Sequence, residues 1–313
     1  AGHTDVVPPG KLSDWTVNPF KPVVKKNHLI GRGANDMKAS VACFVAAVSR
    51  FKSKKFKGSI SLLITGDEEG IAINGTKRVV EYLKRKKEKI EFCLIGEPTN
   101  QNKLGERIKI GRRGSITGYL TVCGIQGHAA YPHDANNPAP VMTKILNQIE
   151  NIKLDKGTKN FQPSNLEIVK INTDNTADNV IPAEATATFN IRFNNKHSSS
   201  SLKKKLNNIF RKACKKSKCS FKISYMVSGE AFLTTPNKTT YMIQKIIKKI
   251  TKVKPKLSTA GGTSDARFIR KISPFVEFGL VGKTAHKVDE MVSVSDMKKL
   301  KKIYLNILLH YFK

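Results

Sequence analysis

The sequence lacks any apolar run of the roughly 18–20 residues that a membrane-spanning helix needs. It also lacks an N-terminal series of charged, apolar and small residues of the kind that marks a signal peptide. Its five cysteines are scattered and form no CxxC pair, which argues against a disulfide framework and a zinc finger. We therefore expect a cytoplasmic protein without a membrane partner. Because the chain opens on Ala1 inside an expected strand, we also expect a fragment of a longer protein.

Acidic residues are scarce: 24 Asp and Glu stand against 56 Lys and Arg, a formal net charge of +32. A basic nucleic-acid-binding protein is one interpretation, but it predicts lysines clustered on one face with aromatic residues among them. The lysines are instead spread along the whole chain, and there is one Trp. We therefore expect a solvated basic surface and no nucleic-acid partner, with some steering of a small anionic substrate.

The first third of the chain alternates short apolar, β-rich runs with segments of helical spacing. The expected strands are Ala1–Val7, Ser59–Thr65 and Phe92–Ile95, and the expected helices are Met37–Phe51 and Thr76–Lys89. This alternation predicts a mostly parallel sheet covered by helices.

After Gly114 the order becomes strand, helix, strand, strand, helix, strand, which is the ferredoxin-like split pattern. The segments are Ser115–Val122, Pro138–Ile152, Leu166–Asn172, Ala185–Phe193, Leu202–Lys215 and Phe221–Val227. The chain then returns to helix at Thr239–Thr251, a Gly-rich turn at Ala260–Asp265, a strand at Phe275–Phe278 and a helix at Ser295–Tyr311. We expect an α/β catalytic domain (1–113 and 229–313) interrupted by a smaller α+β domain (114–228).

Acidic residues or His lie in or directly after the expected strands of the α/β domain, and Asp36 lies where a loop enters an expected helix. The candidates are His3, Asp5, Asp36, Glu68, Glu69, Glu97 and His286. Ligands of open α/β sheets bind beyond the carboxyl ends of the strands, so these groups can converge. Imidazole and carboxylate together suit Zn²⁺, Co²⁺ or Mn²⁺. Each motif is weak alone, but together they predict a two-metal hydrolase.

Residues that are close together in the sequence can have different roles in this site. His3 and Asp5 share one face of a strand, so Asp5 can support a metal ligand at His3. Of Glu68 and Glu69, one can bind metal while the other takes a proton from water.

Seven segments resemble the M20 metallopeptidase family, in family order along the whole chain. They are AGHTDVVPPG, GRGANDMKA, ITGDEEG, LIGEPT, GRRGSITGYLTVCGIQGHAAYPH, DNVIPAEATATFNIRF and TAGGTSDARFI. More narrowly, they look like the branch that hydrolyses N-succinyl-LL-2,6-diaminopimelate to succinate and LL-2,6-diaminopimelate in lysine and cell-wall precursor biosynthesis. The resemblance implies two zinc ions, or zinc with cobalt.

The same resemblance implies a role for each candidate. His3 and Glu97 would bind one metal, Glu69 and His286 the other, and Asp36 both. Asp5 would be the catalytic Asp beside the first metal, and Glu68 the general base.

The inserted domain would, by the same resemblance, form a homodimer, and His128 would reach the active site of the neighbouring subunit as an oxyanion donor. Guanidinium groups suit the carboxylates of the substrate. The substrate residues implied are Arg112, Arg113, Tyr131, Asn179, Arg192, Gly261, Gly262 and Thr263.

Other M20 deacylases, such as an acetylornithine deacetylase or an aminoacylase, would share the metal ligands and stay open as alternatives. The Gly111–Gly114 turn, the segment 131–133 and the segment 262–265 favour the desuccinylase branch. Asn35 stands where the family has a small residue before the bridging Asp, and we expect the change to be tolerated.

Overall fold

The computed structural model describes residues 1–51 and 55–313, and it divides into two compact units. Unit 1 comprises 1–111, 233–259 and 264–313, and unit 2 comprises 112–232 and 260–263. The boundaries expected from the sequence are 113/114 and 228/229, and the main changes between the two units fall at 111/112 and 232/233. The return of residues 260–263 to unit 2 was not expected.

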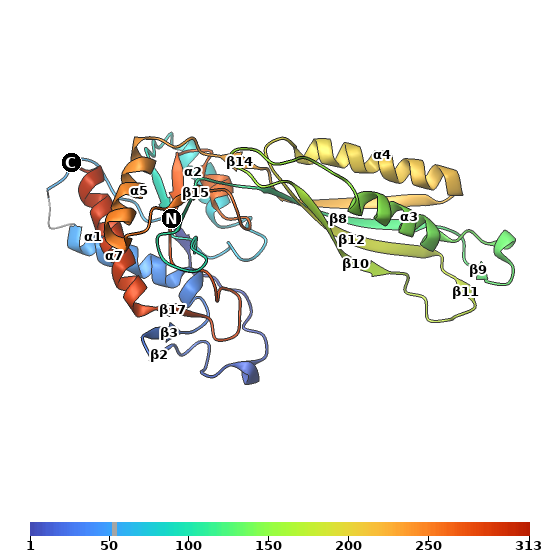
Figure 1. The fold of residues 1–313 in the computed structure, drawn as a ribbon, viewed down its shortest axis with the longest axis horizontal. Helices are drawn as coiled ribbons and strands as arrows, with labels where there is room; N and C mark the ends of the chain where they lie inside the picture. Colours follow the sequence, from blue (N-terminus) through green and yellow to red (C-terminus); the bar gives the residue numbers. More distant parts are fainter. Residues whose placement is uncertain (52–54) are drawn as a thin grey trace. The chain divides into compact units, whose positions relative to one another are not determined.

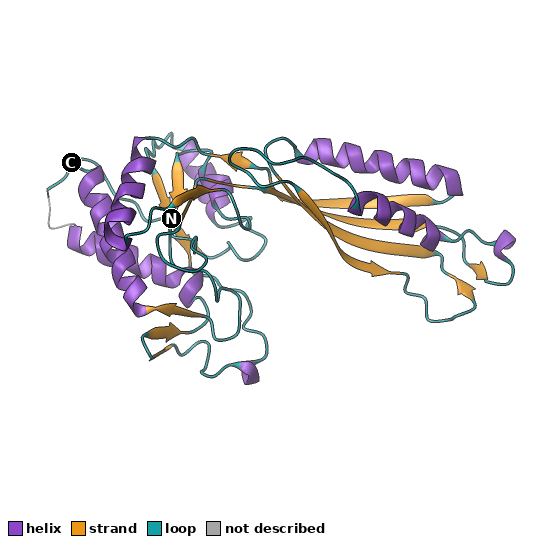
Figure 2. Ribbon diagram, viewed as in Figure 1, coloured by secondary structure: helices purple, strands orange, loops and turns teal. Residues whose placement is uncertain are grey.

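The strands that form the centre of unit 1 are short, and they pair in parallel (Figures 1 and 2). The strands are β1 (Gly2–His3), β4 (Ile64–Thr65), β5 (Cys93–Ile95), β6 (Arg107–Lys109), β15 (Lys256–Ser258) and β16 (Phe275–Glu277). β1 pairs with β4, β5 with β16 and β6 with β15, all in parallel, and one antiparallel bridge joins β16 to β6. Backbone hydrogen bonds from Ala1 to Leu94 and from Gly96 to Ala1 connect β1 to β5. The carboxyl ends of β4, β1 and β5 therefore lie side by side, and the predicted α/β class is confirmed.

The described part of this unit contains five α-helices. They are α1 (Ala39–Phe51), α2 (Thr76–Arg85), α5 (Lys238–Thr251), α6 (Ala266–Ile269) and α7 (Val294–Tyr311). α7 packs on both α1 and α5, and their apolar faces form one core with the strands. Among the described residues, no helix combines the length and apolar character that crossing a bilayer would require.

Several expected strands and helices of unit 1 were too long, and the helix expected at Thr76–Lys89 ends at Arg85. Ala1–Val7 and Ser59–Thr65 form strand only where they pair with each other, at Gly2–His3 and Ile64–Thr65. The expected helix at Met37 begins at Ala39, because Asp36 and Met37 have non-helical dihedral angles within a π-helical turn, η2 (Ala34–Lys38). This irregular turn sets Asp36 apart from the helix that follows.

A three-stranded antiparallel sheet was missed by the sequence analysis. Its strands are β2 (Val23–Lys25), β3 (His28–Ile30) and β17 (Met291–Ser293), in the order β17-β3-β2. Three residues per strand are too few for periodicity to register. The pairing of β3 with β17 brings the loop after Ile30 beside the loop before Met291 (Figure 1).

Unit 2 is a four-stranded antiparallel sheet with two helices. Its main elements are β8 (Gly114–Cys123), α3 (Pro138–Glu150), β10 (Asn165–Asn172), β12 (Glu184–Phe193), α4 (Ser199–Ser217) and β13 (Ser220–Gly229). The strand order β10-β12-β8-β13 is that of the predicted ferredoxin-like pattern. Buried residues alternate along β12, and this face packs with the apolar sides of α3 and α4. The remaining short elements are η1 (Leu12–Asp14), β7 (Gly111–Arg112), β9 (Gly127–His128), η3 (Pro132–Asp134), β11 (Val180–Ile181) and β14 (Phe232–Leu233).

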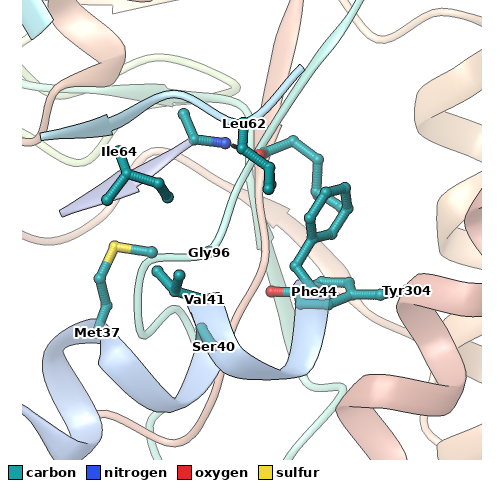
Figure 3. Close-up of a pocket in the computed structure, with 10 residues that line it drawn as sticks. Met37, Ser40, Val41, Phe44, Leu62, Ile64, Gly96 and Tyr304 are labelled. Carbon is teal, nitrogen blue, oxygen red and sulfur yellow. Dashed lines mark hydrogen bonds between the residues drawn. The ribbon is translucent and has the colours of Figure 1, made fainter. Parts of the chain in front are cut away.

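Unit 1 contains a small cavity that is lined in part by Met37, the residue after Asp36 in the sequence (Figure 3). Val41, Phe44, Leu62 and Tyr304 line it, and its volume is about 20 Å³. That is room for about one water molecule, whereas small-molecule sites occupy roughly 300–1,000 Å³. The cavity is a gap in the core and not a substrate pocket.

Candidate metal centre

The first ligand group surrounds His3, at the carboxyl end of β1. The residue is 1% exposed, and its Nε2 lies 3.1 Å from Asp36 Oδ1 and 4.0 Å from Glu97 Oε1. Glu97 follows β5, the neighbour of β1, so the strand order itself places the two groups together. One possible ligand atom each from His3, Asp36 and Glu97, a ring nitrogen or a carboxylate oxygen, lies within 4.8 Å of the other two.

The second group surrounds His286, in the loop between β16 and β17. Its Nε2 lies 2.9 Å from Glu69 Oε1 and 3.4 Å from Asp36 Oδ2. Atoms of Asp36, Glu69 and His286 also lie within 4.8 Å of one another. The two carboxylate oxygens of Asp36 therefore face different His rings, as they would if Asp36 bridged two ions.

Two aspartates hold the acidic loop that follows β4. Asp5 Oδ2 accepts a hydrogen bond of 2.9 Å from the backbone N–H of Glu69, while Asp5 Oδ1 lies 3.3 Å from His3 Nδ1. Asp67 accepts from the backbone N–H groups of Ile73 and Asn74. The Glu68–Glu69 pair is thus anchored from both sides.

The cluster concentrates negative charge, and the pKa values reflect this. Burial would lower the pKa of His3, but the hydrogen bond to Asp36 and the charges of Glu97 and Asp36 raise it to about 10. The hydrogen bond to Asp36 raises the pKa of His286 to about 9. Burial would raise the pKa of Asp36, but hydrogen bonds from both His rings lower it to about 2. The carboxylates around both imidazoles therefore favour positive charge at this site.

Glu68 differs from its neighbour. Burial, with the nearby charge of Asp265, raises the pKa of Glu68 to about 7, and burial also raises the pKa of Glu69. Within the described ranges no residue donates a hydrogen bond to the Glu68 carboxylate, whereas Glu69 contacts His286. Glu68 thus has a free carboxylate beside the ligand groups.

These donors fit two divalent cations. Two imidazoles and three carboxylates are the mixed nitrogen and oxygen set that suits zinc and similar ions. Three carboxylates this close in a partly buried site need a compensating positive charge. His3, Asp36 and Glu97 would hold one ion, and Glu69, His286 and Asp36 the other.

Arg32 and Glu290 also belong to this region, and neither was predicted from the sequence. Arg32 Nη1 lies 2.7 Å from Glu290 Oε2, and both side chains are almost fully buried. Two opposite charges buried together leave no periodic signal in a sequence. The available hints were an Arg inside the Gly-rich segment GRGAND and an acid next to the apolar residues Met291 and Val292.

The expected substrate residues all fall in unit 2, in three local groups. One is at β9 and β11, where the rings of His128 and Tyr131 lie 5.5 Å apart and the carbonyl of Asn179 accepts a bond from Ala129. His128 is exposed, and its Nδ1 accepts a hydrogen bond from Ala130 N–H. A neutral His128 therefore carries its proton on Nε2, as a donor.

Arginines define the other two groups. Arg112 Nη1 donates a 2.7 Å hydrogen bond to the carbonyl of Gly262, beside Gly261 and Thr263. Arg113 donates to the Asn165 side chain. Burial, with the positive charge of Arg192 nearby, lowers the pKa of Arg113. The positive charges of Arg113 and Arg192 favour an anion near them.

The chain is similar to known proteins in both sequence and fold. The model of peptidase family M20/M25/M40 matches residues 1–310. A succinyl-diaminopimelate desuccinylase of Pelagibacter ubique is 71% identical over all of this chain and 82% of its own length. One from Parvibaculum lavamentivorans is 51% identical over all of this chain and 79% of its own length.

Solved structures share the fold. The aminopeptidase PepT of Bacillus cereus aligns with a TM-score of 0.79 at 19% identity, over all of this chain and 80% of its own. The M20 metallo-carboxypeptidase Sso-CP2 of Sulfolobus solfataricus aligns at 0.76 and 18% identity, over 98% of this chain and 83% of its own. The chain belongs to peptidase family M20/M25/M40.

Proposed function

We propose that the chain is a two-metal amidohydrolase that cleaves N-succinyl-LL-2,6-diaminopimelate to succinate and LL-2,6-diaminopimelate. The observation that carries the chemistry is the position of Asp36, whose two oxygens face His3 on one side and His286 on the other. The substrate is suggested by the relatives named as succinyl-diaminopimelate desuccinylases, at 71% and 51% identity. The pathway would be lysine and cell-wall precursor biosynthesis.

Two divalent ions, zinc or cobalt, would polarise the amide carbonyl and make water more acidic when bound. The protein's own contribution is proton transfer by Glu68, whose carboxylate is within 4.8 Å of ligand atoms of His3 and Glu69. Glu68 would take a proton from the attacking water as the oxygen adds to the amide carbon. It would then give that proton to the leaving nitrogen as the C–N bond breaks, so that acid and amine are released.

Asp5 would keep His3 in place. Because Asp5 lies at His3 Nδ1 and also accepts from Glu69 N–H, one carboxylate fixes a ligand of each ion. This supports a positioning role and leaves proton transfer to Glu68.

Unit 2 would recognise the substrate and form the homodimer. Arg112, Arg113 and Arg192 offer forked donors for carboxylates. The Nε2 donor of His128 suits an oxyanion in a neighbouring subunit. Tyr131, Asn179 and the turn of Gly261, Gly262 and Thr263 would complete this surface. A cytoplasmic location agrees with five cysteines in the free form.

A direct comparison of substrates tests the proposal. The protein, loaded with zinc or cobalt, would be given succinyl-diaminopimelate and acetylornithine at equal concentration, and amine release would be measured. We expect a higher kcat/KM for the succinylated substrate. Faster turnover of acetylornithine would replace the narrow assignment by that of another M20 deacylase. No turnover of any acylated amino acid by a protein that binds two metals would reject the enzymatic proposal.

A further inference from the structure

The loops that carry Asp36 and His286 are tied together by a buried carboxylate. Glu290, 1% exposed, accepts backbone hydrogen bonds from Gly33 at 3.0 Å, Asn35 at 2.7 Å and Asp36 at 3.0 Å. Gly33 has a φ of +78°, a conformation that glycine adopts without strain. The backbone of a ligand loop is thus held by a side chain from the other loop.

The connection is reciprocal. The side-chain amide of Asn35 donates to the backbone carbonyls of Val281 and Met291, on either side of His286. Arg32 neutralises Glu290 at 2.7 Å, and its guanidinium lies 5.1 Å from the centre of the Trp15 ring. We call Arg32, Asn35 and Glu290 the loop clasp.

The two His ligands differ in how much other support they have. His3 is buried on a strand, and its second ring nitrogen, Nδ1, lies near both the carboxylate and the carbonyl of Asp5. A metal-binding His almost always has such an outer partner. For His286, whose side chain is 51% exposed, no partner of Nδ1 occurs among the described residues. The orientation of His286 therefore depends on its loop.

We infer that Glu290, with Arg32 and Asn35, positions Asp36 and His286 relative to each other and so sets the affinity of the metal site formed by Asp36, Glu69 and His286. The inference rests on the proposed function for the presence of two metals, and it adds that the clasp governs one site more than the other. The His3 side keeps its own support from Asp5 and the strand pairing.

The test is a titration of the metal-free protein with Co²⁺, in which binding is measured by calorimetry and by visible absorption. His286→Ala and His3→Ala assign the two binding events to the two sites. Glu290→Gln keeps the size of the side chain but places an amide donor against N–H groups. In Glu290→Gln we expect the cobalt affinity of the site that is lost in His286→Ala to fall by about 10–100-fold. The affinity of the other site should change much less.

Asp155→Asn is the matched control. Asp155 is also a buried carboxylate that accepts backbone hydrogen bonds, from Gly157 and Ser164, but it belongs to unit 2. We expect this variant to bind both cobalt ions as the wild type does. Thermal unfolding of each variant checks that the comparison is made between folded proteins.

The outcomes separate the inference from the function. Wild-type protein without two cobalt sites would overturn both. Two sites that are unchanged in Glu290→Gln, or equally weakened, would overturn the inference alone, as would the same weakening in Asp155→Asn. If Glu290→Gln does not fold, Asn35→Ala removes the other half of the clasp without leaving a buried charge. The same selective loss is then expected, and normal binding by Asn35→Ala would count against the clasp.

Discussion

Adjacent glutamates with different surroundings are the clearest feature at the scale of single residues. Glu69 points to His286, at 2.9 Å, and its backbone is held by Asp5. Glu68 lies close to ligand atoms of His3 and Glu69, but its carboxylate is free of hydrogen bonds from the described part of the chain. This difference predicts that one residue holds a metal and the other moves a proton.

Glu68→Ala should therefore lower kcat by about 10²–10⁴-fold, the usual contribution of a general acid or base, and leave the metal content unchanged. Turnover and metal content of the purified variant check this together. Glu69→Ala is the control, because it should lose metal as well as activity. Loss of metal from Glu68→Ala would make Glu68 a ligand and not the base.

At the scale of elements, one loop of unit 2 is held by a single carboxylate. Asp155, between α3 and β10, accepts hydrogen bonds from Gly157, Ser164 and Asn194, and His197 Nε2 lies 3.2 Å away. Burial would raise the pKa of Asp155, but these hydrogen bonds lower it to about 2. The carboxylate thus joins the loop before β10 to the connection between β12 and α4.

A lowered pKa in the folded state means that the ionised form stabilises the protein. The contribution of Asp155 should be complete above the unfolded pKa of about 3.9 and should disappear as the pH falls towards about 2. Asp155→Asn should reduce the free energy of unfolding by about 1–3 kcal/mol near neutral pH. Denaturant unfolding of both proteins from pH 7 to pH 2.5 checks whether this difference shrinks below pH ~4.

Asp134→Asn provides the comparison, because the Asp134 side chain is 75% exposed and should contribute little at any pH. A difference between wild type and Asp155→Asn that stays constant down to pH 2.5 would contradict the role given to the charge.

The elements also show what the sequence can and cannot predict. The long strands and helices of unit 2 were predicted within a few residues, because alternation along β12 and helical spacing along α4 extend over many positions. The strands of unit 1 have two or three residues and pair across long separations, so their limits depend on partners that a local pattern does not contain.

The same reasoning applies to the candidate site. The acidic residues and His could be named from the sequence, since their position in or beside short apolar runs can be seen locally. The pairing of His3 with Asp36 joins residues 33 apart. The contact of Asp36 with His286 and the clasp around Glu290 each span more than 200 residues. Spacing cannot predict such contacts, and only the resemblance to the M20 family suggested the ligand assignment.

At the scale of the whole molecule, the question is whether one chain forms a complete active site. The expected metal ligands lie in unit 1 and the expected substrate residues in unit 2. The resemblance to the M20 family implies that His128 serves the neighbouring subunit. Variants of two different residues can test this, since a mixed dimer has two unlike sites.

Glu68→Ala and His128→Ala should each be nearly inactive alone. Light scattering or sedimentation should first establish a dimer, and the variants should then be mixed under conditions that allow subunits to exchange. If His128 acts across the dimer, a mixed dimer has one site with both residues intact and one with neither. Equal mixing makes about half of the dimers mixed, so activity should rise to about a quarter of the wild-type value. If His128 acts within its own subunit, each site of a mixed dimer still lacks one residue. The activity of the mixture should then not exceed the mean activity of the two separate variants.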